Sequence, residues 1–194
     1  MIRIAIVGQI GSGKTFVSRK FKYPIFNADE EVKRIYNNNK KCFTKLRKKF
    51  PNNIKKFPIK KFELRKIINQ KNIKILSKIV HPYVRLSLNK FLKENRNKDY
   101  VVLDIPLFIE NKLYKKSDVL IYVMASKKKI IQRLKNRGGY NKQIFNILKS
   151  QQLPINKKRK FCDFTIENNS GRNNIYNQVK KIKGILNDRN SVRH

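Results

Sequence analysis

Four short apolar runs stand out along the chain. They cover residues 2–7, 100–103, 119–123 and 164–166, and a weaker fifth run covers residues 24–27. Segments whose apolar residues recur at helical spacing separate them. Strands that read as continuous apolar runs and alternate with helices are typical of a parallel sheet with both faces covered. The pattern therefore predicts an α/β fold, with a parallel five-stranded sheet flanked by helices.

The interval between the second and third strand-like runs, about residues 29–98, is far longer than one crossover helix requires. Apolar residues recur in it at helical spacing, with Leu76 and Val80 ahead of Pro82 and Leu88 after it. Pro82 suits the first turn of a helix, so we expect one helix to end before it and another to begin there. We interpret the interval as a small helical insert that binds the substrate.

A second long segment, about residues 138–160, combines a glycine pair with many lysines. It follows a predicted helix, and its composition predicts an irregular, lid-like connection. The last helix, about residues 173–187, has an apolar face that suits packing against the sheet. The residues from 188 to 194 are expected to form a polar tail.

The first strand runs directly into the sequence GQIGSGKT at residues 8–15. Its glycines let the backbone fold tightly, so that successive N–H groups converge on a phosphate, and the following helix adds its positive end. In this motif the lysine reaches the outer phosphates and the hydroxyl of the last residue binds magnesium. The alternative is a glycine-rich turn that only caps a helix. Its position between a strand and a helix favours a loop that binds ATP, formed by Gly8, Gly11, Ser12, Gly13, Lys14, Thr15 and Phe16.

Among the 12 acidic residues, two that follow predicted strands are the first candidates for chemistry. Asp29 comes just after the second strand, where a carboxylate would face the phosphate loop and act as general base toward an alcohol. Alternatively, Asp29 caps the helix that follows. Asp104 ends a strand at a position where P-loop enzymes hold Mg²⁺ through a carboxylate, although a simple strand-end turn before Pro106 is the alternative. Three further acidic residues suit a helix cap or a local ion pair: Glu110, Asp118 and Asp163.

Arg133 and Arg137 lie four residues apart on one predicted helix, at the entrance to the lid. Guanidinium groups at that position would brace the charge of a transferred phosphoryl group. In a chain this basic, a solvated helix face is the alternative explanation.

The chain has 48 basic and 12 acidic residues, which gives a net charge of +36. A field of that sign attracts phosphate-rich partners, so a basic nucleic-acid-binding P-loop ATPase is one alternative function. Lysine is abundant in helices and turns alike, however, as codon bias would place it. We therefore expect no specific nucleic-acid partner.

The two cysteines are far apart in the sequence and form no CxxC pair, which is typical of reduced thiols. The longest apolar run, residues 119–125, is much shorter than the ~20 residues of a membrane-spanning helix. The chain also opens on a strand-like run rather than a signal-like segment. These features predict a cytoplasmic protein with no membrane association, and we expect a monomer.

Read together, the motifs resemble those of the dephospho-coenzyme A kinase family, in order and over nearly the whole chain. GQIGSGKT is similar to the family's GGIGSGK[ST], and the residues at 27–29 resemble its DAD step. PLFIE at residues 106–110 resembles PLL.E, residues 151–158 resemble a Q...P...K stretch, and residues 162–168 resemble AD..I.N. Shorter elements match at Leu64-Arg65, His81-Pro82, Gln132, Arg133 and Arg137.

The resemblance implies that ATP, with Mg²⁺, phosphorylates the ribose 3′-hydroxyl of dephospho-CoA, which is the last step of CoA biosynthesis. It implies that Asp29 is the base and that Arg137 is a lid residue on the phosphates, so that both are catalytic together with Lys14. With the substrate-binding insert that the resemblance implies, we expect Asp29, Arg65, His81 and Pro106 to bind the substrate. Thr15 and Asp104 remain the expected metal ligands. His81-Pro82 alternatively only starts a helix. The nearest enzymatic alternative is another small-molecule or nucleoside-monophosphate kinase.

The chain departs from the family pattern at Asn27, which stands where the family has its first aspartate. It also has Gln9 for glycine, Phe108 for leucine and Lys33 near a usual arginine. Asn27 keeps the ability to form hydrogen bonds. We predict a single P-loop kinase domain made of a nucleotide-binding core (about residues 1–28, 99–137 and 161–188), the insert at 29–98 and the lid at 138–160.

Overall fold

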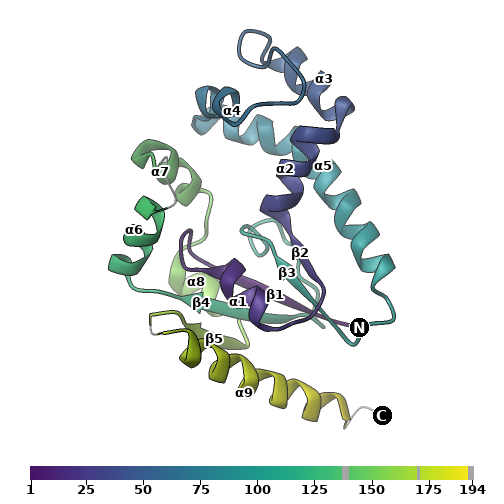
Figure 1. Ribbon diagram of the computed structural model, residues 1–194, viewed down its shortest axis with the longest axis vertical. Helices are drawn as coiled ribbons and strands as arrows, with labels where there is room; N and C mark the ends of the chain where they lie inside the picture. Colours follow the sequence, from purple (N-terminus) through teal and green to yellow (C-terminus); the bar gives the residue numbers. More distant parts are fainter. Residues whose placement is uncertain (137–139, 170, 192–194) are drawn as a thin grey trace. The chain divides into compact units, whose positions relative to one another are not determined.

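The computed structural model describes residues 1–136, 140–169 and 171–191 (Figure 1). The chain divides into two compact units. The first contains Met1–Phe26 and Asn97–His194, and the second contains Asn27–Arg96, where the sequence predicts the helical insert. Each unit is described by itself.

A five-stranded sheet forms the centre of the first unit (Figure 1). Its strand order is β2-β3-β1-β4-β5, and β1 pairs in parallel with β3 and β4, as β4 does with β5. The predicted α/β class with a five-stranded sheet is confirmed. Because β1 is the central strand, the loop that leaves its carboxyl end lies between the ends of β3 and β4. The strands are β1 (Ile2–Gly8), β2 (Ile25–Asn27), β3 (Tyr100–Asp104), β4 (Val119–Met124) and β5 (Phe164–Glu167).

Two helices, α1 (Lys14–Lys20) and α9 (Arg172–Ser191), share a hydrophobic core with the sheet. Ile175, Val179 and Ile182 of α9 are buried against the strands, at the helical spacing that the sequence shows. The helix continues to Ser191, so the expected polar tail from residue 188 is wrong for residues 188–191. A helix that is already nucleated extends past its last packed residue, because each added residue adds a hydrogen bond.

Three shorter helices complete the first unit: α6 (Lys127–Asn136), α7 (Lys142–Ser150) and α8 (Ile155–Arg159). Two of them lie within residues 138–160, so the prediction of an irregular segment there is wrong for the described residues. Asn141 caps α7, its side-chain oxygen accepting a 2.9 Å hydrogen bond from the Ile144 N–H. The lysine-rich composition suggests a loop, but lysine is itself a good helix former, so composition alone does not predict these helices.

The second unit is made of helices: α2 (Ala28–Asn38), α3 (Lys40–Lys49), α4 (Lys61–Ile67) and α5 (Gln70–Glu94). They enclose their own hydrophobic core, to which Ile35 of α2, Leu46 of α3 and Ile67 of α4 contribute buried side chains. Leu76 and Val80 add the apolar face of α5. The unit is therefore held together by contacts among its own helices.

Helix α5 runs unbroken for 25 residues with Pro82 inside it, so the predicted break at Pro82 is wrong. Proline lacks an N–H and crowds the carbonyl one turn earlier, which costs roughly 3 kcal/mol in a helix interior. The apolar face continues across it, with Val80 buried before Pro82 and Tyr83 and Val84 packed on the same core after it. Packing on both sides of the proline offsets the lost hydrogen bond.

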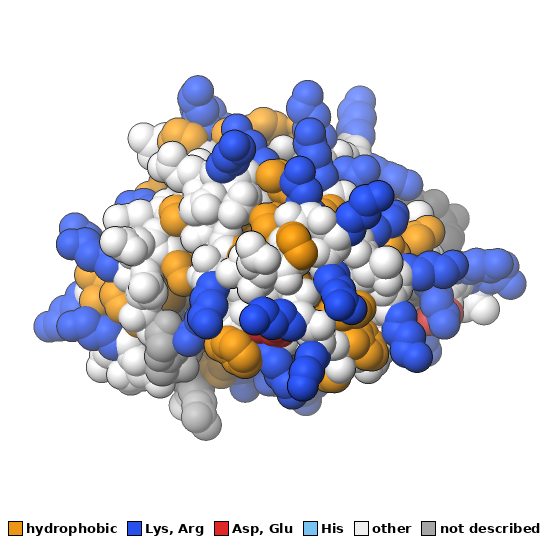
Figure 2. All heavy atoms as spheres, turned by 90° about the horizontal axis from the view of Figure 1, so that it is seen from above, with side chains coloured by type: hydrophobic (Ala, Val, Ile, Leu, Met, Phe, Trp, Pro, Cys, Tyr) orange, Lys and Arg blue, Asp and Glu red, His pale blue; other side chains and the backbone are white. Residues whose placement is uncertain are grey.

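Exposed lysine and arginine side chains occur in both units. On the face drawn in Figure 2, lysine and arginine project all around and do not gather in one patch. No helix in the described ranges is both long and apolar enough to cross a membrane.

Candidate active site

The phosphate loop connects β1 to α1 and depends on glycine at its two ends. Gly8 and Gly13 have φ values of 150° and 94°, a backbone conformation that side chains disfavour. A Cβ at Gly8 would lie 2.5 Å from the Val123 carbonyl oxygen, and one at Gly13 would lie 2.1 Å from Asn168 Nδ2. The loop can therefore adopt this path only with glycine at both positions.

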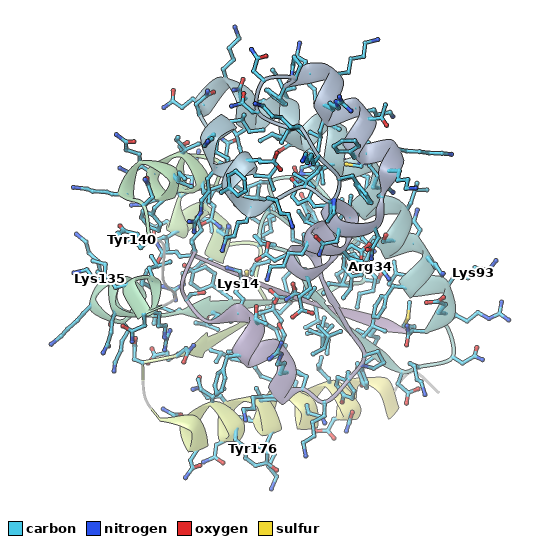
Figure 3. The ribbon with its side chains drawn as sticks, turned by 45° about the horizontal axis from the view of Figure 1, so that its top comes forward. Lys14, Arg34, Lys93, Lys135, Tyr140 and Tyr176 are labelled. Atoms are coloured by element: carbon cyan, nitrogen blue, oxygen red, sulfur yellow. The ribbon has the colours of Figure 1, made fainter. Side chains whose placement is uncertain are left out.

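Lys14 begins α1, and its side chain folds back over the loop (Figure 3). Its Nζ donates hydrogen bonds of 3.2 Å to the Gly8 carbonyl and 2.9 Å to the Gln9 carbonyl. The side chain is buried. The positive charge is thus held at the loop, as an ammonium group that contacts a bound phosphate must be.

Thr15 and Asp104, the two predicted metal ligands, are in direct contact. Thr15 Oγ1 donates a 2.6 Å hydrogen bond to Asp104 Oδ2. Asp104 is the last residue of β3 and is 3% exposed, so the contact is largely shielded from water. A hydroxyl that donates its proton keeps two lone pairs, which a cation can use.

The loop is also held from outside by Arg133 on α6 and Asn168 after β5. Arg133 Nη1 and Asn168 Nδ2 both donate to the Ser12 carbonyl, at 3.0 and 2.8 Å. The sequence predicts Arg133 near a transferred phosphoryl group or on a solvated helix face, and these bonds show it in contact with the backbone of the loop. In the sequence, Asn168 is the last residue of the segment that resembles AD..I.N, and that pattern does not predict a contact with the loop.

Glu110 and Lys158 form a buried ion pair of 2.6 Å. Glu110 follows β3 and also accepts a 2.9 Å hydrogen bond from the Leu153 N–H. The adjacent Gln152 donates a long, 3.4 Å hydrogen bond to the Gly8 carbonyl. The segment between α7 and α8 is therefore attached both to the turn after β3 and to the phosphate loop, which the sequence did not reveal.

The remaining acidic candidates of the first unit have structural partners. Asp118 is buried and paired with Arg3, and it also accepts a hydrogen bond from the Lys115 N–H. Asp163 accepts a 2.8 Å bond from the Leu120 N–H beside the β4–β5 pair. Asp118 thus forms an ion pair, one of the two roles expected for it, whereas Asp163 accepts a backbone hydrogen bond, which was not predicted.

Asp29 lies in the first turn of α2 and is exposed. The cap of that helix is Asn27, whose Oδ1 accepts a 2.9 Å hydrogen bond from the Glu30 N–H. The alternative that Asp29 is the cap is therefore wrong. Asn27, at the position of the family's first aspartate, serves as the N-cap, because asparagine caps a helix about as well as aspartate does.

The other predicted site residues are distributed over both units. Pro106 is half-buried after β3, and Phe16 packs partly against the core of the first unit. In the second unit, Arg65 is exposed in the last turn of α4. His81 is half-buried in α5, where burial and the nearby Arg85 lower its pKa. Arg137 lies outside the described residues.

In the part of the chain that the structure describes, no group of three or more His, Cys, Asp or Glu side chains could hold a metal ion. Structural metals are usually held by three or four protein side chains. Mg²⁺ differs from such metals because it commonly binds through one or two protein oxygens together with phosphate oxygens and water. The oxygens of Thr15 and Asp104 fit that requirement.

Comparison with known proteins identifies the family. The family model described as dephospho-CoA kinase matches residues 2–174. The dephospho-CoA kinase of Zymomonas mobilis is 34% identical over 96% of this chain and 97% of its own length. That of Wolbachia sp. subsp. Brugia malayi is 32% identical over 94% and 97%. The crystal structure of TT1252 from Thermus thermophilus has a TM-score of 0.73 and 26% identity, and covers 96% of this chain and 97% of its own. The chain belongs to the dephospho-CoA kinase family.

Proposed function

We propose that this protein transfers the γ-phosphoryl group of ATP to the ribose 3′-hydroxyl of dephospho-CoA, yielding CoA and ADP. In the transfer, the bond from the γ-phosphorus to the β–γ bridging oxygen breaks and a bond to the 3′-oxygen forms. The hydroxyl proton leaves to a base. Membership of the dephospho-CoA kinase family supports dephospho-CoA as the acceptor.

The observation that carries the proposal is the phosphate loop with Lys14 held over it and Thr15 bonded to Asp104. Within the described residues, the buried Ser12 hydroxyl has no hydrogen-bond partner. Buried polar atoms without partners are uncommon in proteins and call for an explanation, and a phosphate oxygen in the loop would supply one. The loop thus has the donors and the charge that bind the phosphates of ATP.

Asp29 is the base in this proposal. It is an exposed carboxylate two residues beyond β2 in the chain, and it is not used as the helix cap. A positioned base contributes typically about 10²- to 10⁴-fold to a proton transfer. Lys14 and Arg137 stabilise charge on the phosphates, and Arg65, His81 and Pro106 contact dephospho-CoA.

Thr15 and Asp104 would hold Mg²⁺, which when bound neutralises charge on the phosphate oxygens. The pair is prepared for this role, because the 2.6 Å bond fixes the hydroxyl oxygen next to the carboxylate. The proposed domain organisation is a nucleotide-binding core, a helical substrate-binding insert and a lid.

The test is a coupled assay with ATP and Mg²⁺ that offers dephospho-CoA, AMP and shikimate in parallel. We expect turnover of dephospho-CoA alone, and digestion of the product with a 3′-nucleotidase should regenerate dephospho-CoA. Turnover of AMP or shikimate without dephospho-CoA would replace the proposal with a different small-molecule kinase. A Lys14→Met variant controls for contaminating kinases, because removal of the phosphate-loop lysine should abolish the signal.

We further propose a cytoplasmic monomer that has no specific nucleic-acid partner. Both cysteines are free, and burial raises the pKa of Cys42 to about 11 and that of Cys162 to about 12. Such thiols remain protonated and unreactive at neutral pH, which suits a reducing compartment.

Sedimentation equilibrium measures the mass of the protein in solution, which should equal the mass of one chain. Weak binding of DNA and RNA alike, lost uniformly as salt rises, would fit a diffuse charge, whereas a defined site with a steep salt slope would contradict it.

A further inference from the structure

We propose that Arg133 and Asn168 are positioning residues for phosphoryl transfer, which turn the Ser12–Gly13 peptide so that the Gly13 N–H faces the nucleotide phosphates. The inference rests on the proposed function for its role in catalysis. Its geometric basis lies wholly within the first unit.

Both residues donate to the same atom. Arg133 Nη1 lies 3.0 Å from the Ser12 carbonyl oxygen, and Asn168 Nδ2 lies 2.8 Å from it. The donors come from points 121 and 156 residues away along the chain. Two donors on one carbonyl, from two separate elements, leave that oxygen little freedom to turn.

The two donors are also bonded to each other. Arg133 Nη2 donates to the backbone oxygen of Asn168 at 2.8 Å and to its side-chain oxygen at 3.0 Å. Asn168 is only 4% exposed, and its own N–H donates to the Met124 carbonyl at the end of β4. The sheet thus fixes Asn168, and Asn168 and Arg133 orient each other.

Fixing the Ser12 carbonyl fixes the next N–H. In a planar trans peptide the C=O and the N–H point in opposite directions. With the Ser12 oxygen turned toward Arg133 and Asn168, the Gly13 N–H points to the opposite side of that peptide. Converging N–H groups bind anions, whereas a carbonyl turned the same way would repel a phosphate.

Gly13 completes the arrangement. Asn168 Nδ2 occupies the space that a Cβ at position 13 would need, at 2.1 Å. The absence of a side chain at Gly13 therefore lets Asn168 approach the Ser12 carbonyl. The charge of Arg133 next to the same carbonyl further polarises the peptide, which strengthens its N–H as a donor.

The primary test measures ADP binding by titration calorimetry, which needs no acceptor substrate. Arg133→Ala, Arg133→Gln and Asn168→Ala should each weaken ADP binding by about tenfold or more, while Arg133→Lys loses less. The matched control is Lys129→Ala, an exposed lysine one turn earlier on α6, which should bind ADP as the wild type does. Thermal melting identifies any variant that fails to fold, and the conservative Arg133→Lys and Arg133→Gln variants keep the test decisive.

Two further measurements separate positioning from other roles. Because Arg133 and Asn168 hold each other, the loss in the double variant should be smaller than the product of the two single losses. Pyrophosphate should lose affinity by the same factor as ADP. An unchanged pyrophosphate affinity would assign the loss to an adenosine contact and overturn the proposal. An ADP affinity within about twofold of wild type in folded Arg133 and Asn168 variants would overturn it as well.

The Gly13 amide itself can be observed. Only two glycines follow a serine, Gly13 and Gly171, so carbonyl-labelled serine with ¹⁵N-glycine leaves their two signals. Saturating ADP should shift the Gly13 signal strongly in the wild type and less in Arg133→Gln; equal shifts would contradict the proposal. If the wild type binds ADP but does not turn over dephospho-CoA, the proposed function fails, while these comparisons still decide the positioning role.

Discussion

The Thr15 hydroxyl and the Asp104 carboxylate lie 89 residues apart in sequence and share a 2.6 Å hydrogen bond. Thr15 stands in the first turn of the helix after β1, and Asp104 ends β3. β1 and β3 are neighbours in the sheet, so the topology brings the two oxygens together. The pair is the cation site that the proposed function requires.

Replacing Asp104 with asparagine should raise the Mg²⁺ concentration that gives half-maximal rate. Asparagine keeps the size of the side chain and can still accept the bond from Thr15, but it removes the charge that attracts the cation. We expect a shift of at least about tenfold, within the range typical when groups around a metal are altered. Asp99→Asn, an exposed residue just before the same strand, is the control. Superimposable Mg²⁺ titrations of Asp104→Asn and wild type would remove Asp104 from the metal site.

The Glu110–Lys158 pair should contribute strongly to stability. Both side chains are at least nine-tenths buried, and removing one member leaves a buried charge without its partner. Glu110→Gln is expected to lower the free energy of unfolding by roughly 3–5 kcal/mol, and adding Lys158→Met should recover much of that loss. Urea denaturation measures the free energy of unfolding of the single and the double variant. Lys157→Met, at the exposed neighbouring lysine, should have little effect. A double variant as unstable as the sum of both single variants would show that the two charges do not interact.

His81 should make the protein less stable in mild acid. Burial lowers its pKa in the folded state from the usual 6.5, so the unfolded chain binds the proton more readily. Stability therefore rises with pH through this window, and it is lost as the pH falls below the unfolded pKa. The free energy of unfolding should be smaller at about pH 5.5 than at about pH 7.5, and His81→Gln should reduce the difference. The chain has only one other histidine, and His194→Gln is the control. A pH dependence unchanged by His81→Gln would exclude His81 as its source.

The sequence predicted the sheet well because each strand is a continuous apolar run that ends at a turn or a polar residue. Val102 and Ile121 are fully buried, as residues of a sheet covered on both faces should be. The prediction failed at Pro82, where the local preference of proline for a helix start was overridden by the packing of α5 on its core. It also failed at α7, because lysine-rich composition suggests a loop although lysine favours helices.

Some residues of the site could also be predicted from the sequence, and others could not. Lys14 and Thr15 belong to a local motif, so their place at the loop could be read from the sequence. The bonds of Arg133 and Asn168 to Ser12 join three parts of the chain and depend on how α6 and β5 pack. No local pattern specifies such contacts. The same holds for Lys158, which is buried although its neighbours Lys157 and Arg159 are exposed.

Asp29→Asn is the most direct test of the proposed chemistry. Asparagine has almost the same size and shape but cannot accept a proton at neutral pH, so only the chemical step should suffer. Turnover should fall by about 100-fold or more, the usual contribution of a positioned base, while ADP affinity and the KM for ATP stay nearly unchanged.

Glu30→Gln is the matched control, because Glu30 is the adjacent exposed carboxylate on the same helix turn and should be dispensable. The helix cap is formed by Asn27, so neither change should disturb α2, and thermal melting can verify this. A parallel loss of ATP affinity in Asp29→Asn would point to a role in nucleotide binding and contradict the assignment as base. A selective loss of turnover, absent in Glu30→Gln, would leave proton transfer from the acceptor hydroxyl as the step that requires Asp29.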